Sequence, residues 1–450
     1  MISNRFYFYI TLVAAVFVLS SCLDSNDDDT VNYDYSSDAQ ITSISFSSNQ
    51  DSMNVLPGVK FSINQVASVP LIFNRDSLPY LFDVSTVKMD VKTNAASGIK
   101  LHLFNPDSIY LWNNTDSVEI KKLKHIEVFA ANGVTSKLYT FKLNTHQQDP
   151  DTIFWQNVTN GYIDVPKNQN TVANADNFYT YYINDAAVEL STTSVDDGED
   201  WVEASVTGLP ATVVLSSIQN DTLEAREMWY AMDNDSKVYL SDNGLDWTPQ
   251  AVDYPVKAIF GKMPSYGTDS VLAVVNDEGV YKFAKTVDFS TINLLNKIPD
   301  GFPIESFTST TVDNPLVYTA KYLVVTGGYD LNGTANKKVW LLQKNEGEIT
   351  NATKEPAFNV TGSSLFNYDG KIYILTPHEG ENLFYTSPNY GMFWERADSK
   401  QSLPSEFLYR KNQSVNVDNK NNIWIFGGEF ENESQIVDVW KGRINKLFVK

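Results

Sequence analysis

The sequence has few of the residues that most often carry catalysis or bind metals. Cys22 is the single cysteine, and there are only four histidines in 450 residues. A lone cysteine excludes a disulfide framework and a CxxC redox pair. No two histidines stand at metal-ligand spacing, and no Gly-x-Ser-x-Gly elbow or phosphate-cradling glycine loop is present. We therefore expect no metal and no cofactor.

Positive charge is also scarce. Lysine and arginine together number 34 against 55 aspartates and glutamates, which leaves a formal net charge of −21. A surface this acidic repels phosphate backbones, so we expect no nucleic-acid partner.

Long amphipathic helical stripes are hard to find as well. Hydrophobic residues make up 42% of the chain and aromatic residues 13%, and short apolar runs are punctuated by Gly, Asn and Asp. This pattern favours strands. At 450 residues the chain is too long for one ordinary core, so it predicts an all-β protein of two or three domains.

The first 22 residues have the architecture of a signal peptide. Arg5 supplies a positive start, and residues 7–20 form an apolar run too short for a comfortable membrane span. The run ends in Leu19-Ser20-Ser21-Cys22, which resembles a bacterial lipobox. The resemblance implies a lipid on Cys22 and hence a membrane partner. The alternative is an ordinary signal peptide with an incidental cysteine.

Residues 23–38 are acidic and poor in apolar anchors, which predicts a disordered tether. Acidic residues directly after a lipidated cysteine resemble the surface-export signal of Bacteroidota lipoproteins. We therefore expect an outer-membrane lipoprotein exposed on the cell surface, with the periplasmic side as the alternative.

Residues 39–146 alternate apolar and polar positions in seven short runs, which suits an immunoglobulin-like β-sandwich. The predicted strands are 41–46, 59–63, 87–92, 99–103, 117–120, 124–130 and 137–143. A linker-like Gln-Gln-Asp-Pro-Asp stretch follows at 147–151.

Beyond residue 150 a Gly/Trp motif recurs that resembles the Asp boxes of β-propeller hairpins. A short carboxylate or amide accepts backbone N–H groups in the turn, Gly supplies a positive φ, and Trp packs between neighbouring blades. A structural role is therefore expected for Ser194, Asp196, Gly198, Trp201, Asp242, Gly244, Trp247, Ser387, Asn389, Gly391 and Trp394.

A second repeat resembles Kelch blades. Gly327-Gly328 precedes Trp340, and Gly427-Gly428 precedes Trp440, 100 residues further on. Kelch units run near 50 residues, so this offset fits two blades. Residues 147–450 are therefore predicted to form a β-propeller of about six blades, with seven as the alternative. The third strands of the six units would be 187–194, 237–241, 279–284, 338–343, 382–387 and 438–444.

A lipobox, a sandwich and an Asp-box/Kelch-like propeller together resemble a Bacteroidota lipoprotein family, domain-of-unknown-function family 6242. The resemblance would cover nearly the whole chain. It implies an architecture and assigns no catalytic residues, so none are carried over to this chain.

Asp boxes raise the hypothesis of a sialidase, which needs an arginine cluster to hold a carboxylate substrate. Beyond residue 150 the arginines are Arg226, Arg396, Arg410 and Arg443, and no Arg-Ile-Pro motif is present. That hypothesis is therefore disfavoured. A glycoside hydrolase that uses two carboxylates stays open, because acidic residues are plentiful.

In a propeller the loops between second and third strands lie together on the face where ligands tend to bind. Three such loops span 329–337, 377–381 and 429–436. Their candidate binding residues are Tyr329, Asp330, His378, Glu379, Glu381, Glu429 and Phe430. The leading hypothesis is a non-catalytic binding lipoprotein for a glycan or an envelope protein. The alternatives are the two-carboxylate glycosidase, a structural subunit of an envelope complex, and, for the loops, simple solvated acidic turns.

Overall fold

The computed structural model describes residues 35–104, 108–184, 187–223, 225–313 and 321–446. Cys22 and most of the predicted tether lie outside these residues. The described residues form strands joined by loops and a few 3-10 turns, and none of their helices is long and apolar enough to cross a membrane. The chain divides after Asp149 into two units, which are treated separately below.

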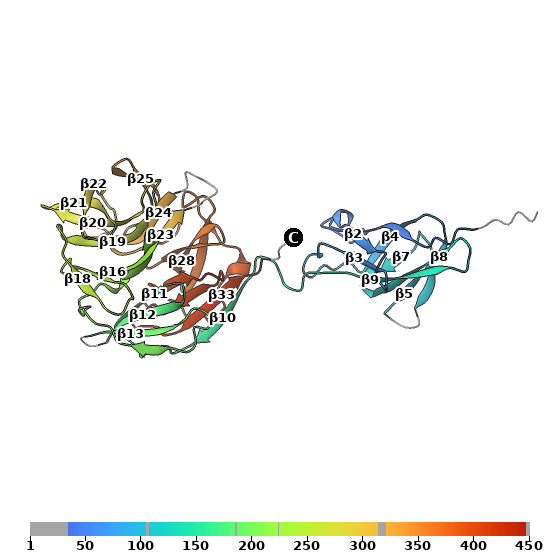
Figure 1. Cartoon of the computed structure of the whole chain (residues 1–450), viewed down its shortest axis with the longest axis horizontal. Helices are drawn as coiled ribbons and strands as arrows, with labels where there is room; N and C mark the ends of the chain where they lie inside the picture. Colours follow the sequence, from blue (N-terminus) through green and yellow to red (C-terminus); the bar gives the residue numbers. More distant parts are fainter. Residues whose placement is uncertain (1–34, 105–107, 185–186, 224, 314–320, 447–450) are drawn as a thin grey trace, which may run out of the picture. The chain divides into compact units, whose positions relative to one another are not determined.

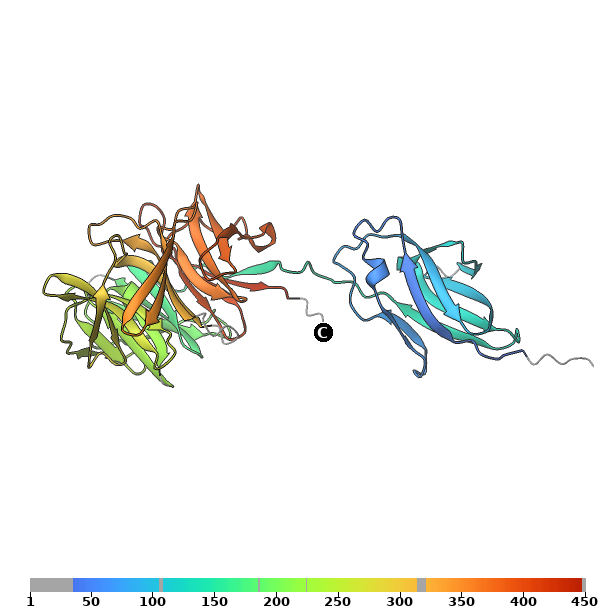
Figure 2. The same ribbon diagram turned by 90° about the horizontal axis from the view of Figure 1, so that it is seen from above.

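The first unit is a sandwich of two sheets (Figures 1 and 2). A three-stranded sheet has the order β1-β4-β7, and a six-stranded sheet has the order β2-β3-β9-β8-β5-β6. The bounds are β1 (Ile41–Ser47), β2 (Phe61–Asn64), β3 (Leu71–Asn74), β4 (Thr86–Thr93), β5 (Ala96–Leu103), β6 (Ile109–Trp112), β7 (Ser117–Glu119), β8 (Leu123–Ala130) and β9 (Ser136–Lys142).

Alternation of burial along these strands explains the sandwich. Ile44 and Phe46 of β1 share one core with Leu101 of β5 and Val128 of β8. Each strand therefore turns one face to the core and the other to solvent. The seven predicted runs all overlap strands, whereas β3 and β6 were missed. Each of these two has four residues, and β6 reads Ile-Tyr-Leu-Trp, without a polar alternation to reveal it.

The second unit contains six four-stranded antiparallel sheets. The first sheet is β11 (Asn168–Ala173), β12 (Asn177–Asn184), β13 (Ala187–Ser194) and β14 (Val202–Ala204); the second is β15 (Gln219–Leu223), β16 (Arg226–Met232), β17 (Val238–Ser241) and β18 (Thr248–Gln250); the third is β19 (Val256–Met263), β20 (Ser270–Asp277), β21 (Val280–Thr286) and β22 (Asn293–Lys297).

The fourth sheet is β23 (Glu305–Asp313), β24 (Lys321–Tyr329), β25 (Val339–Asn345) and β26 (Glu348–Lys354); the fifth is β27 (Ser364–Tyr368), β28 (Lys371–His378), β29 (Glu381–Ser387) and β30 (Glu395–Arg396); the sixth is β31 (Ser414–Val417), β32 (Ile423–Phe426), β33 (Val439–Ile444) and β10 (Ile153–Thr159). Figure 1 shows these sheets following one another around a common axis. The second unit is thus a β-propeller.

The sixth sheet joins the two ends of this unit. Its outer strand β10 comes from the beginning of the unit and pairs antiparallel with β33 at the end, from Ile153↔Ile444 onward. Gly442 makes room for this pairing, because a Cβ there would lie 2.5 Å from the ring of Trp155. The ring is therefore closed by ladder hydrogen bonds between its two ends. The pairing of β10 with β33 was not predicted from the sequence.

Second and third strands carry most of the core. All residues of β32 are buried, as are the first six of β20, because each sheet is covered on both faces by its neighbours. The six predicted third strands correspond to β13, β17, β21, β25, β29 and β33. Each of them is the third strand of its sheet, counted from the inner edge.

The three Gly/Trp hairpins share one hydrogen bond. In each, the indole N–H donates to the carbonyl of the motif glycine: Trp201 to Gly198 (2.9 Å), Trp247 to Gly244 (3.1 Å) and Trp394 to Gly391 (2.9 Å). Trp201 packs near Phe426 of the sixth sheet, and Trp247 near Tyr181 of the first. These two tryptophans thus bridge adjacent sheets.

The turn acceptors differ from the sequence assignment in two of the three hairpins. Asn389 accepts from Phe393 N, and Ser387 accepts from Gly391 N, as expected. In the other two hairpins the acceptor is the residue directly before glycine, which is Asp197 in place of Asp196, and Asn243 in place of Asp242. An Asx side chain reaches N–H groups two and three residues onward, so the position before glycine suits the turn. Asp196 and Asp242 instead pair with Lys420 and Arg226.

Candidate functional site

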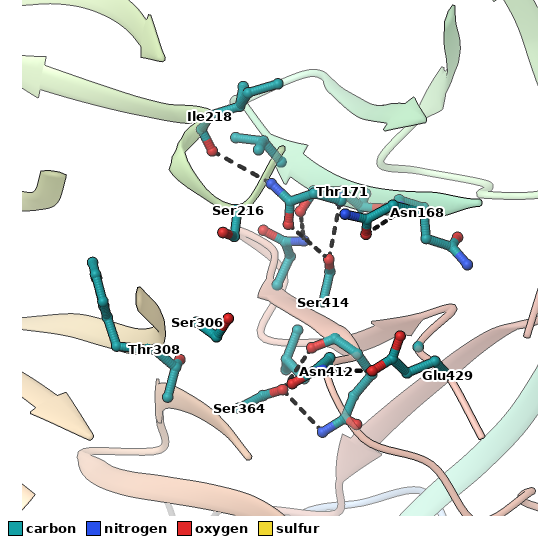
Figure 3. A pocket seen from close by; sticks show the side chains of 18 of the residues that line it. Asn168, Thr171, Ser216, Ile218, Ser306, Thr308, Ser364, Asn412, Ser414 and Glu429 are labelled. Atoms are coloured by element: carbon teal, nitrogen blue, oxygen red, sulfur yellow. Dashed lines mark hydrogen bonds between the residues drawn. The ribbon is translucent and has the colours of Figure 1, made fainter. Parts of the chain in front are cut away.

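A cavity of about 580 Å³ lies among the inner strands of the propeller. Its wall includes residues of β11, β15, β23, β27 and β31, together with the connections that lead into these strands and the β32–β33 loop. We call it the central cavity. Its volume falls in the range of sites for small ligands. Figure 3 shows the side chains gathered around its open centre.

The wall of the central cavity is mostly polar and uncharged. Its charged members are Lys167, Glu429 and Glu433, and its aromatic member is Phe307, which stacks on Phe260. The uncharged polar members are Asn168, Gln169, Asn170, Thr171, Ser216, Gln219, Asn220, Ser306, Thr308, Ser309, Ser363, Ser364, Asn412, Gln413, Ser414, Asn416 and Gln435.

Many of these side chains hold the ring together. The inner strands have no ladder partner on the side of the axis, so their backbone groups need other hydrogen bonds. Each of the six junctions between neighbouring sheets has at least one bond of this kind. They are Asn170 Nδ2 to Leu215 O (3.0 Å), Gln219 Nε2 to Ile259 O (3.4 Å), Ser309 Oγ to Phe260 O (2.7 Å), Leu365 N to Thr308 Oγ1 (3.0 Å), Ser364 Oγ to Gln413 O (2.6 Å) and Thr171 N to Ser414 Oγ (2.9 Å).

Other lining residues are open to solvent. Asn168, Ser216, Ser306 and Asn412 are exposed, and they come from or lead into the first, second, fourth and sixth sheets. Their hydroxyl and amide groups can donate to and accept from a ligand. Gln413 is buried (4% exposed), and its Oε1 has no hydrogen-bond donor among the described residues.

Glu429 is the predicted candidate that lines the central cavity. Its carboxylate accepts from Asn412 Nδ2 (2.8 Å) and Gln435 Nε2 (3.2 Å) and lies 3.3 Å from Lys411 Nζ. Three partners hold this carboxylate in place. It therefore serves to orient its neighbours, and its oxygens are already engaged.

The other predicted candidates lie elsewhere. Asp330 lines a second pocket, of about 340 Å³, together with Val280 and Leu331. Backbone N–H groups of Thr334 and Asn332 hold the pKa of Asp330 below its ordinary value. Tyr329 precedes Asp330 at the end of β24 and is exposed.

His378, Glu379 and Glu381 form the turn between β28 and β29, where Arg396 lies 3.7 Å from Glu381. Phe430 is half-buried in the β32–β33 loop. All three predicted loops do join second and third strands, yet the structure does not gather their residues into one pocket. The inner strands were not predicted from the sequence to line a candidate site. A usable signal was their recurrent Ser/Thr/Asn/Gln composition, as in Asn168-Gln169-Asn170-Thr171.

Two other polar contacts of the propeller involve an ionisable side chain removed from solvent. Arg410 is fully buried and donates to both carboxylate oxygens of Asp438 and to Gly427 O (2.9 Å). Asp221 of β15 accepts from the Tyr230 hydroxyl, and burial raises the pKa of Asp221 above its ordinary value. Arg410 is completely buried, so its ion pair is not presented to a ligand, whereas Asp221 is half-buried.

No group of three or more His, Cys, Asp or Glu residues that could hold a metal ion occurs within the described part of the chain. The acidic residues that line the central cavity, Glu429 and Glu433, come from the same loop. The described wall therefore offers hydrogen-bonding groups rather than a pair of opposed carboxylates.

The fold and cavity thus define a β-propeller protein with a polar central cavity. Residues 149–450 match the model of the DUF6242 beta propeller domain, and residues 37–143 match that of the DUF6242 N-terminal domain. The chain belongs to the DUF6242 family. No curated protein matches it.

Several solved structures are distantly similar. A structure of YjhT is 10% identical, with a TM-score of 0.45, covering 63% of this chain and 96% of that one. A protein of unknown function from Dyadobacter fermentans is 8% identical (TM-score 0.44, covering 66% and 99%). A thermostable family-43 glycoside hydrolase is 11% identical (TM-score 0.29, covering 64% and 90%). Similarities this distant say nothing about the activity of this chain.

Proposed function

We propose that this protein is a non-catalytic, surface-anchored binding lipoprotein that takes a neutral glycan into its central cavity. The observation that carries the proposal is the cavity wall, which combines about 580 Å³ of space with many hydroxyl and amide side chains and few charges. Sugars present hydroxyl groups that both donate and accept, and such a wall complements them.

The charge balance of the cavity wall favours a neutral ligand. Two carboxylates, Glu429 and Glu433, line the cavity against one lysine, Lys167, and the chain as a whole carries a net charge of −21. An anionic sugar would be repelled at close range. The proposal is therefore restricted to neutral glycans.

The architecture fits this role. We propose that each of the six four-stranded sheets is one blade and that the N-terminal sandwich is immunoglobulin-like and acts as a spacer. The lipobox-like sequence ending at Cys22 supports attachment to a bacterial outer membrane, and the acidic residues 23–38 support display on its outer surface. The periplasmic side is the alternative location.

The test is an array of neutral and acidic oligosaccharides probed with the full-length protein. We expect binding to a subset of neutral oligosaccharides and no release of reducing ends during long incubation. Turnover of any of them would instead support the two-carboxylate glycosidase. An array without any signal would sink the glycan proposal and leave an envelope protein as the partner to seek.

A further inference from the structure

Two residues that line the central cavity have a backbone conformation that side chains rarely adopt. Ser306 has φ 51° and Asn412 has φ 56°. Both are exposed at the cavity wall. Figure 3 labels both residues among the side chains that surround the opening. Strained residues of this kind persist where the surrounding structure holds them, and they concentrate at functional sites.

The Gly-Gly repeats lie opposite these two residues. The pairs Glu305↔Tyr329 and Phe307↔Gly327 place Ser306 opposite Gly328, and the pairs Lys411↔Glu429 and Ser414↔Phe426 place Asn412 opposite Gly428. A Cβ on Gly328 would lie 2.2 Å from Glu305 O, and a Cβ on Gly428 would lie 2.9 Å from Lys411 O. The paired glycines therefore let the second strand approach the backbone that flanks each strained residue.

The fourth, fifth and sixth sheets have an equivalent position near the start of the inner strand. Ser306 stands two residues before Thr308, and Asn412 stands two residues before Ser414. Thr308 and Ser414 each accept a backbone N–H from the next sheet. In the fifth sheet the same position, two residues before Ser364, is Gly362, with φ 69°. Glycine adopts this conformation without a steric penalty, so the fourth and sixth sheets keep a side chain where glycine would fit better.

The polar atoms of both side chains are available to a ligand. The Ser306 hydroxyl has no hydrogen-bond partner within the described residues, and neither has Asn412 Oδ1. Glu429 accepts from Asn412 Nδ2, so the amide is oriented with Oδ1 left as an acceptor. An exposed acceptor without a donor calls for a ligand that donates a hydrogen bond.

We propose that Ser306 and Asn412 are the residues that determine ligand specificity in the central cavity. Asn412 Oδ1 accepts from a ligand hydroxyl, and the Ser306 hydroxyl donates to or accepts from another. The ligand class is a neutral polyhydroxylated sugar, because a carboxylate or phosphate has no hydrogen to give to Asn412 and would face Glu429. This inference rests on the proposed function and specifies which atoms perform it.

The variants that test it are Ser306→Gly and Asn412→Gly in the full-length protein, titrated with the neutral oligosaccharide that gives the strongest array signal. We expect each to weaken binding about tenfold, which corresponds to one lost hydrogen bond. Ser306→Gly should also raise Tm, by about 2 °C. Asn412→Gly should raise it less, because Asn tolerates the left-handed region better than Ser and because the bond from Asn412 Nδ2 to Glu429 is lost. Ser306→Ala should lose affinity without the gain in Tm.

Glu346→Gly is the matched control. Glu346 has φ 46° in the exposed turn between β25 and β26, away from the cavity wall. It should gain thermal stability with unchanged affinity. Unchanged affinity of Ser306→Gly and Asn412→Gly would overturn this inference while leaving the proposed function standing. A fall in Tm for Ser306→Gly would overturn the strain premise, and wild type that binds no neutral oligosaccharide would overturn both proposals together.

Discussion

Arg410 and Asp438 form an ion pair in which both side chains are almost completely removed from water, at 0% and 7% exposure. Arg410 also stacks over Phe407, 4.1 Å from the ring centroid, and its backbone bonds with the Asn382 side chain. A buried charge is tolerated only with such a set of partners. The pair therefore joins the connection that precedes β31 to the start of β33.

Removal of one partner should be costly. Asp438→Asn leaves the Arg410 guanidinium buried without a counter-charge, and we expect it to lower the free energy of unfolding by about 3 kcal/mol or more. Asp242→Asn is the control, because its partner Arg226 is exposed, and it should change stability by less than about 0.5 kcal/mol. Urea denaturation of both variants measures the contrast. Equal effects would show that the buried pair contributes no more than a surface pair.

Asp221 gives stability a dependence on pH. Burial raises its pKa, although the Tyr230 hydrogen bond acts in the opposite direction. An acid with a raised folded-state pKa contributes stability below its ordinary value of 3.8 and loses it as the pH rises through the folded-state value. Asp221→Asn cannot ionise, so its stability relative to wild type should increase over that window.

The control for this experiment has the opposite sign. Hydrogen bonds from Ser290 lower the pKa of Asp288 below its ordinary value of 3.8. As the pH rises from the lowered value to 3.8, wild type gains stability from the ionised carboxylate, so Asp288→Asn should lose stability relative to wild type. Denaturant unfolding of both variants at several pH values between about 3 and 7 measures the two differences. Difference curves that stay flat with pH for Asp221→Asn would show that this carboxyl has an ordinary pKa.

The elements differ in how well the sequence predicts them. Third strands were located because each hairpin that follows or precedes them carries a Gly or Trp marker, such as Gly198 after β13. Inner strands were missed because polar side chains of β11 and β23, such as Asn170 and Ser309, bond across the junctions between sheets, and that use is not visible in one strand alone. The candidate loops were found from the same Gly and Trp markers. The position of a loop between two strands does not show which residues line the central cavity.

The hairpin glycines should differ in importance according to what lies beside them. Gly198 has φ 70°, and a Cβ there would lie 2.4 Å from the Trp424 ring of the sixth sheet. Gly370 has nearly the same φ, 72°, with open space around it. Gly370→Ala should cost about 1 kcal/mol from backbone strain alone, and Gly198→Ala about 3 kcal/mol, since overpacking against Trp424 is added. Thermal unfolding of the two variants would contradict this account if their Tm values fell equally.

At the scale of the whole molecule, the proposed attachment to a membrane depends on a single atom, the Cys22 sulfur. If Cys22 carries a lipid, mass spectrometry of the mature protein should show an N-terminal cysteine with an added diacylglycerol. Cys22→Ala should then move the protein from the membrane fraction to the soluble fraction. Ser21→Ala is the control, because a small residue is retained there. Membrane association that persists in Cys22→Ala would show that another feature anchors the chain.

The closure of the ring makes the stability of the propeller depend on residues far apart in sequence. β10 completes the sixth sheet by pairing with β33, and Ile153 and Trp155 pack there with Trp440 and Ile444. Without β10, β33 becomes an exposed edge and loses this cover. A fragment of residues 150–450 should therefore unfold cooperatively, whereas 161–450, which lacks β10, should show a much lower Tm and bind hydrophobic dye. Because the two fragments share every other strand, equal Tm values would show that the other five sheets and β31–β33 hold the ring without this closing strand.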